Sequence, residues 1–494
     1  MNLSERVRRN LAEGGEITAI TFNDAAYSWN TVRGLVDPLS AALKAADPGG
    51  QFAAIVLRNR PSGVAAQICL MAERRTSVMI TPIQPALSMC ADVRAINPSV
   101  VIADRQDWND QLDEAVKSIG AAGFEIFEEG GSFGLAVRPG LERAAAAKPN
   151  PFEGAGIVVP TSGTTGPPKR VPVRWERVDS YAPAADRPVT QGHGVIQTNP
   201  LVTIGATAVF LTAIAKPLNL VLMEKLDVVK WADLVERHKP RRTGLPPAGL
   251  RMLMESNVPK EKFASIEAFV TGSAPFPPEE IETLENKFGK PLLYSYGATE
   301  FGGTGTVAAW TLETRARHRL DKRGSAGQAS PGVKLRVIDP ADGKVVAPGE
   351  EGILEVHKPD APVSGPDGWI RTNDLAVIDA DDFLFIRGRA DDTIIRGGFK
   401  VPLGEVEAAL TAHPAVYRAA AIGLPDARLG QVPAAAVMLE EGYPGEVAEA
   451  ELIAWARERL NPYKVPVKVK VVAAIPMTQL LKVSRPQLRE LLAD

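Results

Sequence analysis

A hydroxyl- and glycine-rich stretch at residues 161–169 follows a short apolar run at residues 156–159. The apolar run is typical of a buried strand. Glycines allow a backbone to approach an anion closely, hydroxyls and amide N–H groups donate to phosphate oxygens, and a lysine adds positive charge. Pro167 and Pro168 exclude a helix directly after the stretch.

These features predict a phosphate-binding loop. Its glycines are too close together for a GxxxxGK[ST] loop. An ordinary Ser/Thr/Gly turn is the alternative, because such residues mostly mark loops. The residues expected to hold phosphate groups are Thr161, Ser162, Gly163, Thr164, Thr165, Gly166 and Lys169.

The length of 494 residues predicts two or more domains. Hydrophobic residues make up 45% and charged residues 23%, as in soluble globular proteins. The net charge of −3 gives no reason to expect nucleic acid or an anionic membrane as a partner. Cys69 and Cys90 are too few for a disulfide framework or a cysteine zinc site, and the five histidines lack metal-ligand spacing.

The N-terminal residues lack the apolar core of a signal peptide. No uninterrupted apolar run approaches the roughly 20 residues needed to span a bilayer. We therefore expect a cytoplasmic protein without a membrane span. A homodimer is compatible with the sequence.

Helix-like and strand-like segments alternate along the first 150 residues. Apolar residues at helical spacing predict a helix at residues 28–46, and the apolar residues at 63–72 indicate a second helix. Short apolar runs predict strands at residues 52–57, 77–80 and 100–104. Alternation of this kind favours α/β layers with parallel strands.

A second α/β stretch runs from residue 194 to residue 303. Strands lead into two small-residue segments, Thr271–Pro275 and Tyr296–Glu300, with a helix expected at about residues 278–288 between them. Ligands bind beyond the carboxyl ends of strands in open α/β sheets, so both segments are candidate binding sites.

From residue 324 onward, short strands and Gly/Pro turns predict a smaller β subdomain, followed by a compact α+β tail. We expect an α/β and α+β fold with two domains. The large N-terminal domain covers residues 1–390, with the β subdomain at about 324–390, and the small C-terminal domain covers residues 391–494.

Five segments, in order, resemble motifs of the adenylate-forming superfamily, which comprises acyl- and aryl-CoA synthetases, peptide-synthetase adenylation domains and luciferases. The chain looks most like a stand-alone acyl- or aryl-CoA ligase. The segments are residues 161–169, Tyr296–Glu300 (YGxTE), Gly368–Leu375 (GW(Y/F)RTGDL), Arg396–Glu407, and Ile475–Arg485 (P-x-T-x-x-G-K-x-x-R).

The resemblance implies the adenylate-forming enzyme fold with a mobile C-terminal lid, and a site for ATP and Mg²⁺. Thr299 would donate to the α-phosphate, and Glu300 would hold Mg²⁺. Asp374 would accept hydrogen bonds from both ribose hydroxyls, and Arg389 would contact ribose or phosphate. The residues implied beside the adenine are Gly272, Ser273, Ala274 and Tyr296.

The remaining roles implied by the resemblance concern the lid and the second substrate. Lys482 would bridge the carboxylate and the α-phosphate during adenylation, Asp391 would be the hinge, and Gly397 and Gly398 would line a tunnel for the pantetheine arm of coenzyme A. The implied acyl pocket comprises Thr203, Gly205, Gly272 and Gly297.

The implied reaction is ATP-dependent activation of a carboxylic acid to acyl-AMP, followed by thioester formation with coenzyme A. No aspartate for a substrate amine lies between Pro200 and Phe210, which counts against the activation of an amino acid. A hydrophobic acid, aryl or medium-chain acyl, is the expected substrate. Two alternatives stay open. One is a ligase that loads a separate carrier protein or stops at acyl-AMP; the other is a non-catalytic nucleotide- or acyl-binding relative, motivated by the family departures Thr203, Asn373 and Leu481.

Overall fold

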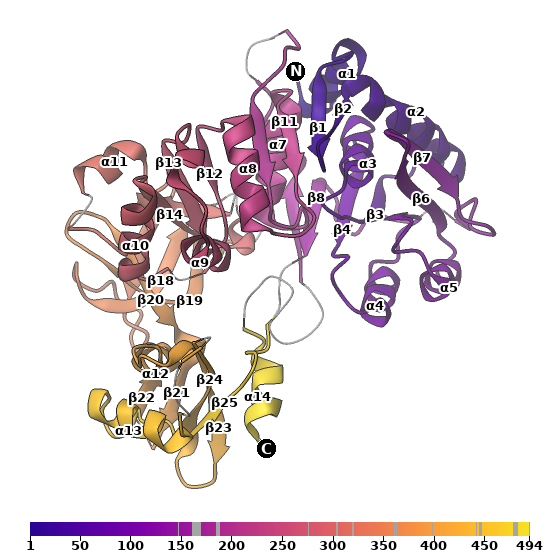
Figure 1. Ribbon diagram of the computed structural model, residues 1–494. Helices are drawn as coiled ribbons and strands as arrows, with labels where there is room; N and C mark the ends of the chain where they lie inside the picture. The colour runs from indigo at the N-terminus through magenta and orange to yellow at the C-terminus, as the bar shows by residue number, and fades with distance from the viewer. Residues whose placement is uncertain are drawn as a thin grey trace. The chain divides into compact units, whose positions relative to one another are not determined.

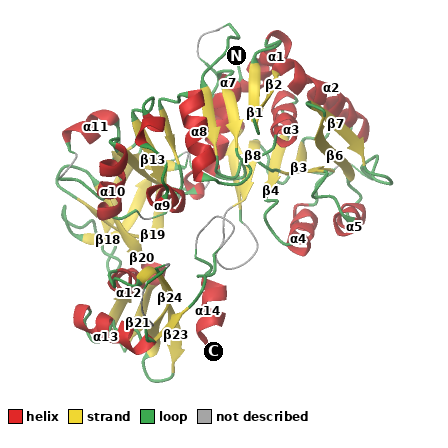
Figure 2. Cartoon of the chain, in the orientation of Figure 1, coloured by secondary structure: helices red, strands yellow, loops and turns green. Residues whose placement is uncertain are grey.

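The computed structural model describes residues 1–146, 148–160, 169–183, 188–274, 276–302, 305–318, 321–359, 361, 363–397, 399–440, 442–443, 447–477 and 483–493. These residues form two compact units (Figures 1 and 2). The first unit takes its residues from 1–160, 169–331 and 358–368, and the second from 332–357 and 369–493.

Within the described residues, the first unit holds three sheets, which we name the β3, β11 and β13 sheets after a central strand of each. The β3 sheet has the order β7-β6-β5-β3-β4-β8-β9, with bounds β3 Phe52–Val56, β4 Thr76–Ile80, β5 Val100–Asp104, β6 Ala122–Glu129, β7 Ser132–Val137, β8 Ala155–Pro160 and β9 Arg170–Arg174. The β11 sheet has the order β10-β11-β1-β2, with bounds β1 Thr18–Phe22, β2 Ala25–Ser28, β10 Gly194–Gln197 and β11 Asn219–Leu222. The β13 sheet has the order β12-β13-β14-β15-β16, with bounds β12 Arg242–Gly244, β13 Ala268–Gly272, β14 Leu292–Gly297, β15 Thr306–Ala309 and β16 Gln328–Ala329.

Helices separate most of these strands along the chain, as Figure 2 shows. Their bounds are α1 Leu3–Glu13, α2 Trp29–Ala46, α3 Pro61–Ala72, α4 Ala86–Ile96, α5 Asp110–Ser118, α6 Trp175–Asp179, α7 Ile204–Ala215, α8 Val228–His238, α9 Pro247–Glu255, α10 Pro278–Phe288 and α11 Leu312–Arg317, with short 3₁₀ helices η1 Lys260–Phe263 and η2 Thr299–Phe301.

The second unit holds an antiparallel sheet and a mixed sheet in its described part. The antiparallel sheet contains β17 Lys334–Ile338, β18 Glu351–His357, β19 Trp369–Ile378 and β20 Leu384–Arg389. The mixed sheet contains β21 Thr393–Arg396, β22 Phe399–Pro402, β23 Val416–Asp426, β24 Gly430–Leu439 and β25 Lys468–Val471. The helical segments are η3 Ala390–Asp392, α12 Leu403–Thr411, α13 Glu449–Arg459 and α14 Arg485–Ala493.

The predicted α/β rhythm is confirmed, with local differences. Helix α2 begins after its N-cap Ser28, whose hydroxyl accepts the N–H of Thr31. The β3 sheet is parallel in its centre but antiparallel at both edges, where β7 and β9 join by hairpins. The second compact unit begins at residue 332, because the residues from there on pack mainly against one another. The predicted domain boundary at Asp391 concerns a hinge between moving parts, and it stays a prediction.

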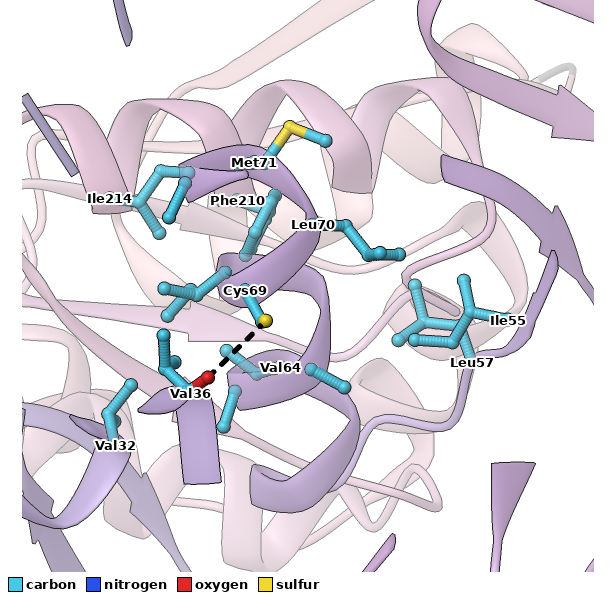
Figure 3. Packing of buried hydrophobic residues seen from close by; sticks show 14 of the residues in the cluster. Val32, Val36, Ile55, Leu57, Val64, Cys69, Leu70, Met71, Phe210 and Ile214 are labelled. Atoms are coloured by element: carbon cyan, nitrogen blue, oxygen red, sulfur yellow. Dashed lines mark hydrogen bonds between the residues drawn. The ribbon is translucent and has the colours of Figure 1, made fainter. Parts of the chain in front are cut away.

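One hydrophobic cluster is shared by the β3 sheet, the β11 sheet and the helices between them. Every residue of α3 is buried, which explains why its apolar residues show no single-sided pattern. Figure 3 shows Cys69 and Met71 of α3 in this cluster with Val36 of α2 and Phe210 of α7. Because the two sheets share a core, loops that follow their strands are held close to one another.

Among the helices in the described part of the chain, none combines the length and the apolar character that crossing a bilayer requires.

The two thiols are predicted to be unreactive in the folded protein. Cys69 is fully buried, its Sγ lies 3.6 Å from the carbonyl oxygen of Val36, and burial raises its pKa to about 12. Cys90 is 1% exposed, and burial raises its pKa as well. A disulfide reagent such as DTNB should therefore label neither thiol until the chain unfolds, and both after denaturation. Rapid labelling of either cysteine in native protein would contradict this packing.

Candidate functional site

Residues 271–274 of the first predicted segment, and the second segment Tyr296–Glu300, lie where two neighbouring parallel strands end at the same edge of the β13 sheet; Pro275 is outside the described residues. Strands β13 and β14 pair in parallel, with Thr271 opposite Tyr294 and Gly272 opposite Ser295. Thr271, Gly272, Tyr296 and Gly297 are the last residues of these strands rather than parts of a turn. The edge where both strands end is where open α/β sheets bind ligands.

Side chains of β14 hold the end of β13 in place. The hydroxyl of Tyr294 donates to the carbonyl oxygen of Ala274 at 3.2 Å, and the hydroxyl of Ser295 donates to that of Thr271 at 3.2 Å. A Cβ at Gly272 would lie 2.8 Å from the carbonyl oxygen of Ser295. Ser273 has a φ of +69°, a left-handed conformation in which non-glycine residues are uncommon.

The backbone of the Tyr296–Glu300 segment packs against the backbone at Gly305. The N–H of Ala298 donates to the carbonyl oxygen of Gly305 at 2.9 Å, and a Cβ at Gly297 would lie 2.1 Å from that oxygen. Thr299 and Glu300 follow in η2, and both are half-buried. Glycine at 297 is therefore required by a close backbone approach.

The first turn of α7 lies beside this segment. A Cβ at Gly305 would lie 2.8 Å from Cγ2 of Ile204 and 3.0 Å from the carbonyl oxygen of Ala298. Thr203 is the N-cap of α7, and its hydroxyl donates to the carbonyl oxygen of Pro200 at 2.9 Å. A Cβ at Gly205 would meet no atom within 4 Å. The structure thus places the predicted pocket residues Thr203 and Gly205 on either side of Ile204, which lies against Gly305.

The predicted phosphate loop follows β8 and precedes β9 along the chain, and the antiparallel pairing of these two strands puts Pro160 opposite Arg170. Lys169 is exposed and directly precedes β9. Arg170 forms an ion pair with buried Asp92 of α4, and it donates to the carbonyl oxygen of Met79 at 2.5 Å. The predicted phosphate ligands Thr161, Ser162, Gly163, Thr164, Thr165 and Gly166 lie outside the described residues.

In the second unit, the predicted ribose ligands face each other across two strands. Asp374 of β19 is directly opposite Arg389 of β20, and the carboxylate and guanidinium are 4.0 Å apart. The N–H of Asp374 donates to the hydroxyl of Thr372 at 3.1 Å. The structure therefore brings these two side chains together as an ion pair, and their roles toward a ribose stay a prediction.

The predicted hinge and tunnel residues lie further along the same unit. Asp391 is in η3, and Gly397 has a φ of +55° and donates its N–H to the carbonyl oxygen of Leu429 at 2.8 Å. Gly398 and Lys482 lie outside the described residues.

Backbone pairing and an ion pair hold the residues before and after positions 478–482, the stretch that contains Lys482. Met477 and Val483 form an antiparallel bridge, and Arg485 forms an ion pair with Asp392 at 2.7 Å. Nearby, Glu407 of α12 accepts the N–H of Ala421 at 2.8 Å. Burial raises the pKa of Glu407, although this hydrogen bond and the positive charge of Arg485 oppose the shift.

The implied Mg²⁺ fits the donor chemistry at Glu300. Mg²⁺ is usually bound by one or two carboxylates together with the phosphates of a nucleotide. The described part of the chain contains no group of three or more His, Cys, Asp or Glu residues placed to hold a metal ion. A half-buried carboxylate on η2 is compatible with a shared protein–nucleotide site.

Residues 7–362 match the model of the family described as AMP-binding enzyme, and residues 405–482 match the model of the AMP-binding enzyme C-terminal domain. The chain belongs to the AMP-binding enzyme family. The predicted superfamily and the enzyme class of an acid–thiol ligase are thereby confirmed.

Relatives of this AMP-binding enzyme include the indoleacetate–CoA ligase of Aromatoleum aromaticum, which is 29% identical, with 100% of this chain and 98% of the relative covered. A long-chain-fatty-acid–CoA ligase of Mycobacterium tuberculosis is 31% identical, with 70% of each chain covered. The crystal structure of ATP-bound MatB from Rhodopseudomonas palustris has a TM-score of 0.80 at 23% identity, with 99% of each chain covered. This last likeness confirms the predicted adenylate-forming fold.

Three residues that help to build the site were missed from the sequence. Tyr294 and Ser295 hold the end of β13, and Gly305 lies against both α7 and the Tyr296–Glu300 segment. The strand-end rule applied to β14 would have pointed to Tyr294 and Ser295, because they directly precede the motif. Gly305 carries no local signal, since its role depends on backbone contact with distant residues.

Substitution at Gly297 is predicted to disrupt nucleotide binding. A methyl group there would lie 2.1 Å from a backbone oxygen, so the strand end must shift. We expect Gly297→Ala to weaken ATP affinity about 100-fold, since a shift of about 1 Å in such a site has effects of that order. Isothermal titration calorimetry measures the dissociation constant for ATP of the variant and of the wild-type protein.

The matched control is Gly205→Ala, whose added methyl group meets open space. It should change ATP affinity by less than about threefold, as surface substitutions do. Equal ATP affinities of the two variants, at unchanged melting temperature, would contradict the described packing of Gly297.

Proposed function

We propose that this AMP-binding enzyme is an acyl- or aryl-CoA synthetase that uses ATP, Mg²⁺ and coenzyme A. The observation that carries the proposal is the parallel pairing of β13 with β14, which brings the Gly272–Ala274 and Tyr296–Glu300 segments to one strand edge beside the first turn of α7. Two CoA ligases among its relatives, one acting on indoleacetate and one on long-chain fatty acids, support the reaction class.

In the first half-reaction, a carboxylate oxygen of the acid attacks the α-phosphorus of ATP. The bond from this phosphorus to the bridging oxygen breaks, and pyrophosphate leaves with the electron pair. In the second half-reaction, the deprotonated thiol of coenzyme A attacks the acyl carbon, forming the thioester and releasing AMP. Neither half needs a covalent intermediate with the protein, so positioning and electrostatics supply the catalysis.

The protein residues would hold the charges that develop in adenylation. The hydroxyl of Thr299 donates to the α-phosphate, and Glu300 is the proposed ligand of Mg²⁺, which neutralises phosphate charge when bound. Lys482 carries the mobile positive charge at the reacting phosphorus. The β- and γ-phosphates are assigned to Thr161, Ser162, Gly163, Thr164, Thr165, Gly166 and Lys169.

The nucleoside and the second substrate are assigned to other residues of the motif series. Tyr296, Gly272, Ser273 and Ala274 would contact the adenine, and Asp374 and Arg389 the ribose. Asp391 is the proposed hinge, and Gly397 and Gly398 would admit the pantetheine arm.

A hydrophobic acid is the proposed substrate class. Helix α7, with the sequence IGATAVFLTAIA, carries no charged side chain and so offers no charged partner for a polar substrate group. Gly205 is exposed, and a Cβ there would meet no atom within 4 Å, so the protein does not obstruct a bulky acid at this position. The substrates named for the two relatives, indoleacetate and long-chain fatty acids, are likewise largely apolar.

The cytoplasmic location expected from the sequence is part of this proposal. One chain carries every residue named in it, so the chemistry does not depend on the homodimer that the sequence allows.

The test is a panel of aliphatic and aromatic carboxylic acids assayed for AMP release with ATP and Mg²⁺, in the presence and absence of coenzyme A. We expect at least one apolar acid to give AMP and the CoA thioester in equal amounts. Pyrophosphate release without thioester formation would instead favour a ligase that loads a carrier protein. Absence of acid-dependent pyrophosphate release across the panel would contradict the proposed function.

The Lys482→Ala variant is predicted to separate the two half-reactions. Loss of this cation should slow acyl-AMP formation by about 100-fold or more, because charge develops on the α-phosphate in that step. Thioester formation from supplied acyl-AMP should change little, since the lid would then present Gly397 and Gly398 instead. Rapid-quench assays of each half measure this, and equal losses in both would contradict the rotating-lid assignment.

A further inference from the structure

Asn59 lies in the loop after β3, and 6% of its surface is exposed. Its Nδ2 donates to the carbonyl oxygen of Asn199 at 2.9 Å and to that of Met223 at 3.1 Å. Its Oδ1 accepts the N–H of Leu201 at 2.8 Å. One side chain from the β3 sheet thus binds the two segments that follow β10 and β11 of the β11 sheet.

The segment after β10 is a compact turn in which other hydrogen bonds fix the backbone. Gln197 donates to the carbonyl oxygen of Asn199 at 2.6 Å. The N–H and the hydroxyl of Thr203 both lie 2.9 Å from the carbonyl oxygen of Pro200. Thr207 donates to that of Leu201 at 3.3 Å. Because these hydrogen bonds lie within the turn, we expect the turn to move as one unit when its hydrogen bonds to Asn59 are lost.

This turn leads directly into the first residues of α7, Ile204 and Gly205. Ile204 packs on Gly305, whose carbonyl oxygen accepts the N–H of Ala298. A displacement of the turn would therefore move Ile204 and Gly205 relative to Gly297 and its neighbour Ala298. Of these residues, Gly205 and Gly297 are assigned to the acid pocket.

Two arginines on either side of Asn59 fix its backbone. Arg58 binds Asp107 through two nitrogens, with Nε 2.8 Å from the carboxylate, and Arg60 binds Glu128 at 2.9 Å. Both guanidinium groups also lie 3.5 Å from Glu224, which directly follows one of the carbonyl groups that Asn59 binds. Asn59 is thus held between charged groups while its amide reaches the turn.

On the basis of the proposed function, we propose that Asn59 is a positioning residue that sets the wall of the carboxylic-acid pocket. Its amide fixes the turn at residues 199–203, and the turn fixes Ile204 and Gly205 against Gly297 and Ala298. Asn59 touches neither ATP nor the acid in this account. Its loss should therefore affect the affinity and selectivity for the acid more than the use of ATP.

The first test uses Asn59→Asp and Asn59→Ala, assayed with hexanoate, decanoate and benzoate as probe acids. A carboxylate at residue 59 keeps the acceptor for Leu201 but faces two carbonyl oxygens without a donor. We expect the KM for the preferred acid to rise about tenfold or more in both variants, with the KM for ATP within about twofold of the wild-type value. The ratio of kcat/KM between hexanoate and decanoate should change as well.

The matched control is Asn10→Ala. Asn10 is fully buried, and its amide donates to the carbonyl oxygen of Ile214 at 2.6 Å, near the far end of the same helix α7. This variant should lower the melting temperature while leaving the KM for the acid unchanged. Equal effects of the Asn59 and Asn10 variants on both KM values would show a purely structural role and overturn the proposal.

A second measurement does not depend on turnover. Hydrogen exchange of the Leu201 amide should be slow in wild-type protein and at least about tenfold faster in Asn59→Ala, because its acceptor is removed. Unchanged exchange at Leu201 would overturn the positioning role even in an active enzyme. The wild-type enzyme could adenylate none of the probe acids while the Leu201 amide still exchanges faster in Asn59→Ala. That result would uphold the role of Asn59 in holding the turn and would contradict the proposed function instead.

Discussion

The parallel register of β13 and β14 is the constraint on which the site depends. With Thr271 opposite Tyr294, the two strands end at the same edge of the sheet, and the segments that follow them therefore begin side by side. Hydroxyls of Tyr294 and Ser295 then hold the end of β13, and the missing side chain of Gly297 lets the chain approach Gly305. A slip of one residue would reverse which side chains face the site.

The shared core gives this edge a fixed surrounding. Because the β3 and β11 sheets bury one hydrophobic cluster around α3, loops from both sheets meet beside the first turn of α7. Asn59 and its flanking arginines use this proximity to connect the two sheets through hydrogen bonds and ion pairs. Buried polar groups that are fully paired favour one arrangement over others, since any other leaves carbonyl oxygens without donors.

The sequence predicted those parts of the structure that depend on local pattern. Helix α2 at Trp29–Ala46 agrees with the helix predicted from apolar spacing at residues 28–46, and the structure adds that Ser28 is its N-cap. The roles of Asn59 and Gly305 were not predictable, because their partners are distant in the sequence and no local pattern marks them. Thr203 was predicted as a pocket residue. Its hydroxyl caps α7, a structural role that the sequence analysis did not predict.

The most direct test of this account is hydrogen–deuterium exchange of the whole chain with and without ATP and Mg²⁺. If the ends of β13 and β14 bind the nucleotide, amides at residues 272–274 and 297–301 should exchange more slowly when ATP is present, and those of α9 should not change. Nucleotide binding measured in the same solution, with unchanged exchange at both strand ends, would contradict the account.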